Sequence, residues 1–126
     1  MINKETEFTA ADNSGAKIVK VIASMKKSLK NVEVGDFILV CVKSLRKRRR
    51  IFSKVRKGKV YLGIIVGLSK EKRKVRHSFS KKDVNTTVLL SRAYKLLGNR
   101  VYKALPIELR RKPLIRPLCS GLLKLI

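Results

Sequence analysis

The chain keeps its positive charge and its apolar residues in separate segments. Residues 46–59 contain nine Lys or Arg and no acid, and residues 70–82 contain seven Lys or Arg with Glu71 as the only acid. Residues 60–68 lie between these two basic segments and residues 84–90 follow the second; both are apolar and rich in β-branched side chains. Such a chain can build a core from its apolar segments while its connections present dense positive charge. We therefore expect strands joined by basic loops.

Five segments have the length and composition of β-strands. They are residues 5–9, 17–23, 37–42, 61–68 and 84–90, with turn-forming residues between them. Residues 17–23 alternate only partly, with Lys17 on the same face as Val19 and Val21. Short strands with turns between them predict a mostly β protein, a small five-stranded β-barrel of the OB or SH3-like kind. The side chains expected to point inward are Val19, Val21, Ile38, Val40, Ile65, Val88 and Leu90.

The last third of the chain changes character. Pro106 suits the first position of a short α-helix, which would carry Leu105 and Leu109 on one face. Pro113 and Pro117 then interrupt the helical pattern. A length of 126 residues allows one domain. We expect a barrel over about residues 1–97 and a short C-terminal α-helical segment, within a tail over about 98–126, that packs on it.

The net charge predicts a polyanionic partner. The chain has 32 Lys and Arg against eight Asp and Glu, a formal charge of +24. Such a charge repels itself, and the phosphates of a nucleic acid can neutralise it. With 44% hydrophobic residues the chain is too apolar for a disordered basic tail, and no apolar run approaches the ~20 residues that span a bilayer. The composition favours a folded nucleic-acid-binding domain without a membrane partner.

The sequence offers little for catalysis. His77 is the only histidine, and no pair of metal ligands at helical spacing, phosphate-binding loop or nucleophile motif occurs. Asp12 and the other acids before residue 40 are interpreted as turn or edge residues. We therefore expect no enzyme activity, no metal site and no cofactor.

Cysteine usage and the first residues bear on the compartment. Cys41 and Cys119 are too few for a disulfide framework and suit a reducing environment. Glu5 and Glu7 argue against a secretory signal or a transit peptide in this sequence. We expect the protein to act where it is made, or the sequence to be a mature form.

Four blocks of sequence identify a resemblance. The most specific is Ala-Asp-Asn-Ser-Gly-Ala at residues 11–16. Three further blocks follow it in order: Val-Gly-Asp-Phe-Ile at 34–38, residues 63–66 with 85–90, and Gly-Asn-Arg-Val-Tyr at 98–102 leading to 108–110. Together they resemble the family of large-subunit ribosomal protein number fourteen over essentially the whole chain. The resemblance implies a five-stranded β-barrel that binds large-subunit ribosomal RNA, touches neighbouring ribosomal proteins and faces the small subunit and its RNA.

Two sets of residues are candidates for these contacts. A-form RNA is recognised by shape, phosphate and 2′-hydroxyl, for which Arg and Lys are suited. The predicted ribosomal-RNA contacts are Lys17, Lys20, Arg46, Lys47, Arg48, Arg49, Arg50, Lys54, Arg56, Lys57, Lys59, Lys72, Arg73, Lys74 and Arg76. By resemblance, the residues that face the small subunit or a ribosome silencing factor are Asn99, Arg100, Arg110 and Arg111.

The aromatic residues favour one mode of RNA binding over another. No strand pairs aromatic side chains as a stacking platform would, and Phe37 and Tyr61 are expected in the core. We therefore expect contact with RNA duplexes and phosphates rather than stacking on unpaired bases.

Several positions depart from the family pattern. The loop after Lys43 is longer than usual, Arg76 and His77 replace an Asp-Gly turn, Lys82 stands where an aromatic is common, and Lys103 where a Gly is. Such changes, with the Lys, Ile, Leu and Ser bias of the chain, are typical of an organellar protein. They predict the matrix of the mitochondrion and its ribosome, with the plastid or the bacterial cytoplasm as alternatives.

Two other functions stay open at this point. One is a freestanding OB-type RNA-binding protein, such as an RNA chaperone or translation factor, although few aromatics are available for stacking. The other is a peripheral membrane protein held by its polybasic loops, although the sequence has no amphipathic helix with a large apolar face.

Overall fold

The five predicted strands are present. The computed structural model describes residues 2–25, 28–47, 53–68, 85–98, 100–102 and 109. The strands are β1 (Glu7–Ala10), β2 (Ala16–Ser24), β3 (Phe37–Leu45), β4 (Val60–Gly67) and β5 (Thr86–Leu90), with a 3₁₀ turn, η1 (Leu29–Asn31), before β3. Their ends differ from the predicted ones by three residues at most. The predicted C-terminal helix lies outside the described residues, apart from Leu109.

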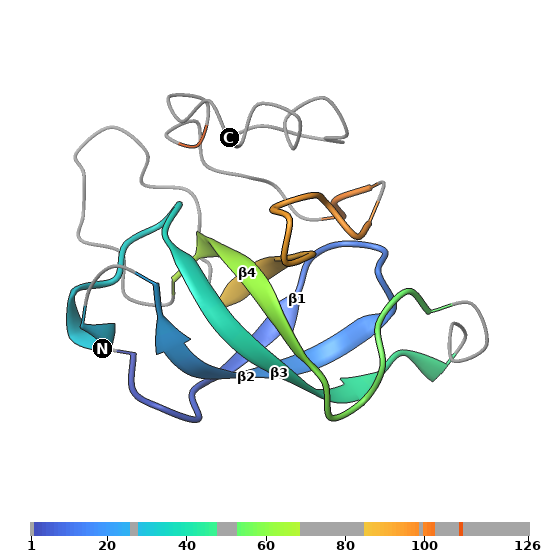
Figure 1. The fold of residues 1–126 in the computed structure, drawn as a ribbon, viewed down its shortest axis with the longest axis horizontal. Helices are drawn as coiled ribbons and strands as arrows, with labels where there is room; N and C mark the ends of the chain where they lie inside the picture. Colours follow the sequence, from blue (N-terminus) through green and yellow to red (C-terminus); the bar gives the residue numbers. More distant parts are fainter. Residues whose placement is uncertain are drawn as a thin grey trace.

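The strands close into a barrel. Neighbours in the chain pair antiparallel from β1 to β5, and β5 then pairs in parallel with β1 through Thr9 with Thr86 and Ala10 with Thr87. Figure 1 shows β3 and β4 crossing in front of β1 and β2. Closure leaves no sheet edge with unpaired backbone groups. The predicted fold class, a mostly β five-stranded barrel, is confirmed. No helix among the described residues has the length and apolar character to cross a membrane.

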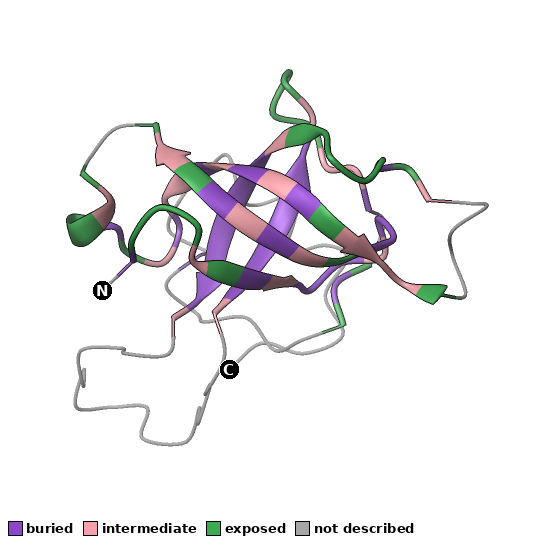
Figure 2. Ribbon diagram, turned by 90° about the horizontal axis from the view of Figure 1, so that it is seen from below, coloured by how far each residue is buried: buried purple, intermediate pink, exposed green. Residues whose placement is uncertain are grey.

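Side chains from all five strands fill the barrel. Along β2 and β3 buried residues alternate with more exposed ones, as Figure 2 shows. This alternation places every second residue inside, as the two-residue period of a strand requires. The inner cluster consists of Ile2, Phe8, Ala10, Ala16, Val19, Val21, Val32, Ile38, Val40, Val42, Val55, Ile65 and Leu89. Tyr61 is half-buried against this cluster, so the prediction that it lies in the core is partly confirmed.

A second cluster covers the outer face of β4 and β5. It contains Ala11, Leu62, Ile64, Val66, Val88, Leu90, Val101 and Leu109, with Phe37 half-buried against it. The prediction that Val88 and Leu90 point into the barrel was therefore wrong in direction, although both are buried. Leu89 occupies the interior instead. β5 is buried on both faces, since later residues of the chain, including Val101 and Leu109, cover its outside.

An irregularity at the start of β2 corrects the predicted position of Lys17. Ala16 and Val19 are both fully buried, although three positions separate them. The pairing of β2 with β3 shifts register here, between Ala16 and Ile18 and again between Ile18 and Val19. A bulge of this kind places an extra residue in one strand and changes which face the following side chains occupy. Lys17 is therefore exposed and does not share the inward face of Val19.

Candidate nucleic-acid interface

One end of the barrel gathers three segments that are far apart in the sequence. The turn between β1 and β2 lies at its centre, where Gly15 adopts a φ of +105°, a backbone conformation that favours glycine. The carbonyl of Gly15 accepts from the N–H of Arg46 at 2.9 Å, just after β3, and the carbonyl of Ser14 accepts from the N–H of Lys54 at 3.0 Å. Both limbs of the β3–β4 connection are thus fixed to this turn.

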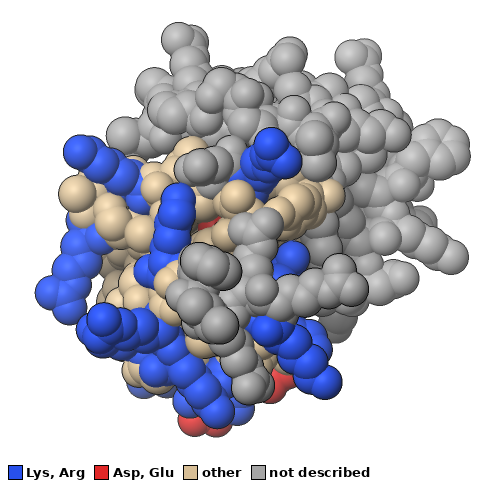
Figure 3. Space-filling model, turned by 90° about the vertical axis from the view of Figure 1, so that its right-hand side faces the viewer, with Lys and Arg blue, Asp and Glu red and all other residues tan. Residues whose placement is uncertain are grey.

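Basic side chains surround this end. Figure 3 looks onto it and shows Lys and Arg over much of the described surface, with little acidic surface. All but one of the residues concerned are exposed; Arg46 is half-buried. We call the set the basic end, and it consists of Lys17, Lys43, Arg46, Lys47, Lys54, Arg56, Lys57, Lys59 and Arg100. Cations attached to a fixed backbone around one turn are suited to binding phosphate, because less conformational freedom is lost on binding.

Residues 53–59 are held against the barrel by a buried anchor. Val55 is 1% exposed and belongs to the inner cluster. The N–H of Arg56 donates to the Tyr61 hydroxyl at 3.0 Å, and the N–H of Gly58 donates to the carbonyl of Val42 at 2.8 Å. These contacts fix the backbone while the basic side chains on either side of the anchor stay exposed; they are Lys54, Arg56, Lys57 and Lys59.

Arg46 makes contacts within the protein. One terminal nitrogen of its guanidinium donates to the carbonyl of Ala10 at 3.0 Å. The guanidinium carbon lies 5.5 Å from the centre of the Tyr102 ring, which is the geometry of a cation–π contact. Arg46 therefore joins the end of β3 to the segment after β5. Only the guanidinium N–H groups that are not used in these contacts are available to bind phosphate.

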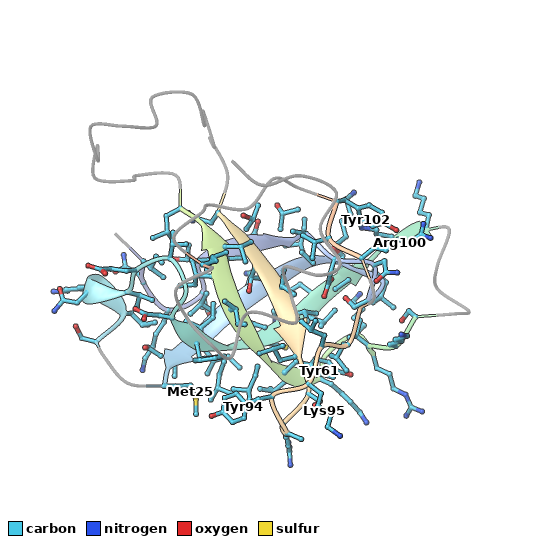
Figure 4. The ribbon with its side chains drawn as sticks, turned by 90° about the horizontal axis from the view of Figure 1, so that it is seen from above. Met25, Tyr61, Tyr94, Lys95, Arg100 and Tyr102 are labelled. Atoms are coloured by element: carbon cyan, nitrogen blue, oxygen red, sulfur yellow. The ribbon has the colours of Figure 1, made fainter. Side chains whose placement is uncertain are left out.

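The segment around Arg100 is clamped onto the same turn. The N–H of Arg100 donates to the side-chain oxygen of Asn13 and the N–H of Asn13 donates to the carbonyl of Arg100, both at 3.1 Å. The N–H of Tyr102 donates to the carbonyl of Ala11 at 2.8 Å. A Cβ at Gly98 would lie 2.6 Å from the Asn13 oxygen, so the backbone here approaches too closely for a side chain. Figure 4 shows Arg100 and Tyr102 beside each other at this end.

Asp12 is the buried centre of the clamp. It lies in the turn between β1 and β2, as interpreted from the sequence, but it is only 1% exposed there. One carboxylate oxygen accepts from the Ser14 hydroxyl at 2.7 Å, and the other accepts from the N–H of Leu89 at 3.1 Å. Burial raises the pKa of the Asp12 carboxyl above its ordinary value, and the hydrogen bonds from Ser14 and Leu89 act in the opposite direction. Asp12 thereby links β5 to the turn that holds Arg100.

The structure brings some predicted contact residues together and not others. Those at the basic end are Lys17, Arg46, Lys47, Lys54, Arg56, Lys57, Lys59 and Arg100. Lys20 is half-buried in the middle of β2, opposite Glu7 on one side and Cys41 on the other, and it is not part of the basic end. The remaining predicted residues lie outside the described residues; they are Arg48, Arg49, Arg50, Lys72, Arg73, Lys74, Arg76, Asn99, Arg110 and Arg111.

Three residues of this end were not among the predicted contacts. Lys43 is exposed near the end of β3, and its position after an apolar run gave a signal that it would leave the core. Tyr102 and Asp12 act through contacts with Arg46 and Leu89, which lie 56 and 77 positions away in the sequence. No local pattern could have identified those two partners.

Within the described ranges, no three His, Cys, Asp or Glu side chains lie together in a way that could hold a metal ion. Cys41 is a half-buried free thiol on β3. What this end of the molecule presents is positive charge on a fixed backbone, which is suited to binding phosphate.

Comparisons with known proteins agree on one family. A family model described as ribosomal protein L14p/L23e matches residues 1–119. The large ribosomal subunit protein uL14 of Aquifex aeolicus (strain VF5) is 38% identical to this chain over 112 residues, which is 89% of each chain. The protein of the same name from Aquifex pyrophilus is also 38% identical, over the same length and the same shares.

Proposed function

Because this chain belongs to the ribosomal protein L14p/L23e family, we propose that its basic end, apart from Arg100, holds the phosphate backbone of large-subunit ribosomal RNA. Membership of the family makes the protein a structural component of the large ribosomal subunit. Its association with ribosomal RNA and with other ribosomal proteins follows from the same membership. The residues that make each contact are the proposal.

The convergence of three segments on one turn is the observation that carries this proposal. Exposed cations at the basic end are attached to backbone that main-chain hydrogen bonds and the buried Val55 keep in place. Acidic side chains occupy little of this surface, and Asp12 beneath it is buried. A polyanion approaching this surface therefore meets positive charge with little opposing charge. Each phosphate that it neutralises releases a condensed counterion, which favours binding.

We further propose that the segment around Arg100 contributes to the interface with the small subunit. Arg100 is exposed, and two hydrogen bonds with Asn13 orient its backbone. It lies next to the RNA-binding cations and not on a separate side of the barrel, because Arg46 contacts Tyr102. The same segment is our candidate for the docking site of a ribosome silencing factor.

A charge-reversal experiment tests the RNA-binding surface. The double variant Arg56→Glu/Lys57→Glu changes two exposed residues of the basic end. The double variant Lys4→Glu/Lys30→Glu makes the same change in net charge at two exposed residues elsewhere, before β1 and in η1. The first should lower incorporation into large subunits, measured by sedimentation of cell or organelle extracts. The second should incorporate nearly as the unchanged protein does.

The salt dependence of RNA binding gives an independent measure. For the purified protein and large-subunit RNA, the slope of log affinity against log salt concentration should be shallower by about 2 in the basic-end double variant, because each lost phosphate contact removes about one counterion. Equal slopes for the two double variants would contradict the assignment of the basic end. A protein that stays in light fractions would favour a freestanding RNA-binding protein instead.

The compartment is a separate proposal. We propose that the protein belongs to a mitochondrial ribosome, on its departures from the family pattern and the composition of the chain. The two relatives named above are bacterial proteins, so a bacterial ribosome stays an alternative. Sedimentation of an extract from isolated mitochondria tests this: the protein should cosediment with the mitochondrial large subunit, and its absence from mitochondria would refute the proposal.

A further inference from the structure

The turn after β5 carries an exposed tyrosine in an unusual backbone conformation. Tyr94 has a φ of +60°, in the left-handed region that residues with a Cβ rarely adopt. Three hydrogen bonds with Ser91 hold it there. The N–H of Tyr94 donates to the carbonyl of Ser91 at 3.0 Å, the N–H of Lys95 donates to the Ser91 hydroxyl at 3.3 Å, and the N–H of Ser91 donates to the carbonyl of Lys95 at 2.8 Å.

The Tyr94 ring is oriented by a second aromatic residue but not covered. Its centre lies 5.3 Å from that of Phe37, and the two rings are at 88° to each other. Phe37 is half-buried against the outer cluster, so it provides a fixed support. Tyr94 nevertheless remains 46% exposed. Figure 4 shows Tyr94 and Lys95 on the outside of the barrel, away from Arg100 and Tyr102. An oriented, accessible ring is what a stacking partner requires.

The charges around this ring favour an anionic ligand. Arg92 and Lys95 are exposed on either side of Tyr94 in the same turn. Asp36 precedes Phe37 in the chain, but its carboxylate accepts a hydrogen bond from the N–H of Glu33 at 2.9 Å. A flat aromatic surface in a turn that also carries two exposed cations matches a nucleotide, whose base can stack while neighbouring phosphates meet the positive charge.

We propose that Tyr94 stacks on an unpaired base of the large-subunit ribosomal RNA, and that Arg92 and Lys95 hold the adjacent phosphates. The inference rests on the proposed function, since it adds a second contact of a different kind to the same RNA. It also departs from the expectation of contact with RNA duplexes and phosphates rather than stacking on unpaired bases. No strand carries a stacking platform, but this turn presents a single ring.

The accessible area of the ring is large enough for one base. A large aromatic side chain offers at most about 250 Å², so the 46% of Tyr94 that is exposed amounts to on the order of 100 Å². Met25 is 43% exposed, and its N–H donates to the carbonyl of Phe37, which places a second apolar side chain near the ring. Together these areas suit one stacked base.

The test uses variants that the backbone of the turn accepts. Tyr94→Gly removes the ring and the Cβ, and glycine adopts a left-handed conformation readily, so the turn should keep its shape. Tyr94→Asn also tolerates this conformation. Tyr94→Phe keeps the ring. Each protein is added to large subunits that lack it, and the RNA is probed with reagents that modify unpaired nucleotides.

The expected result is a local change in the RNA. At least one unpaired nucleotide should be protected by the unchanged protein and by Tyr94→Phe, and it should become reactive with Tyr94→Gly and Tyr94→Asn. The affinity of the purified glycine variant for large-subunit RNA at fixed salt should fall by about 5- to 140-fold. Identical reactivity at every nucleotide for all four proteins would overturn the inference.

A crosslinking measurement distinguishes the two possible neighbours. A photoreactive side chain introduced as Tyr94→p-benzoylphenylalanine should crosslink to RNA in assembled subunits. A crosslink to a ribosomal protein alone would overturn the stacking site and identify a protein contact. If the unchanged protein did not sediment with large subunits, the proposed function would fail. If all variants sediment with large subunits and give the same pattern of nucleotide reactivity, only the proposed stacking site is refuted.

Discussion

Replacing Asp12 by alanine should loosen the clamp that holds the segment around Arg100. The carboxylate accepts from the Ser14 hydroxyl and from the N–H of Leu89, and both partners are fully buried. The change removes both acceptors at once, in a place where water cannot replace them. The barrel strands themselves keep their pairing, so we expect a folded but weakened protein.

The magnitude follows from the groups left unpaired. A buried N–H without an acceptor costs about 1–3 kcal/mol, and a lost hydroxyl hydrogen bond costs about 0.5–1.5 kcal/mol. Removing a carboxyl whose burial is unfavourable offsets part of this cost. We therefore expect Asp12→Ala to lower the free energy of unfolding by roughly 1–3 kcal/mol. For 126 residues the total is on the order of 6–19 kcal/mol.

The pH dependence gives the effect a sign that can be checked. Because the folded-state pKa of Asp12 is raised, its contribution to stability is fully present below the unfolded-state pKa and is lost as pH rises through the folded-state pKa. The difference in unfolding free energy between the unchanged protein and Asp12→Ala should therefore be largest in acid and shrink as pH rises. Other acids titrate alike in both proteins and cancel in the difference.

The assay is urea unfolding followed by far-ultraviolet circular dichroism at several pH values, with amide hydrogen exchange as a local readout. Exchange of the Tyr102 amide, which donates to Ala11, should speed up more than that of Val40 in β3. A loss below about 0.5 kcal/mol would show that Asp12 is not a structural centre. A difference that grows with pH would show that hydrogen bonds to the charged carboxylate outweigh its burial.

Three further changes test the fold and the interface. Ile65→Ala should cost about 2–5 kcal/mol because it leaves a cavity in the inner cluster; a loss under 1 kcal/mol in urea unfolding would place this side chain outside a packed core. Gly98→Ala should lower the melting temperature, because its methyl group would lie 2.6 Å from a side-chain oxygen of the neighbouring turn; an unchanged melting temperature would refute the close approach. Arg100→Glu should leave incorporation into large subunits nearly intact and weaken subunit joining in gradient profiles, whereas Arg48→Glu/Arg49→Glu should impair incorporation; the reverse pattern would exchange the two roles.

The strands and most of the core could be predicted from the sequence. Each strand is a run of β-branched and apolar residues bounded by turn or charged residues, and this pattern is local. For the same reason Val19, Val21, Ile38, Val40 and Ile65 were correctly expected to be buried inside the barrel. The net charge and its concentration in the connections favoured a nucleic-acid partner without any structure, because counting charges needs no coordinates.

The direction of side chains in β5 was decided only by the tertiary structure. An apolar run such as residues 84–90 does not show which of its faces is the inner one when both are buried. Val88 and Leu90 face outward because Val101 and Leu109 cover that side. The residues that cover the outer face of β5 come later in the chain, and a periodic pattern within one strand contains no information about them.

The composition of the basic end likewise depended on contacts between distant residues. From the sequence, Arg46 was predicted to bind RNA together with its basic neighbours. In the structure its guanidinium donates a hydrogen bond to the carbonyl of Ala10 and lies over the Tyr102 ring. Folding also buried Asp12 and brought Arg100 to the turn that holds both limbs of the β3–β4 connection. The sequence by itself determined which segments are strands and that the surface is positively charged. Closure of the barrel decided which charges meet, because the parallel pairing of β5 with β1 joins residues more than seventy positions apart.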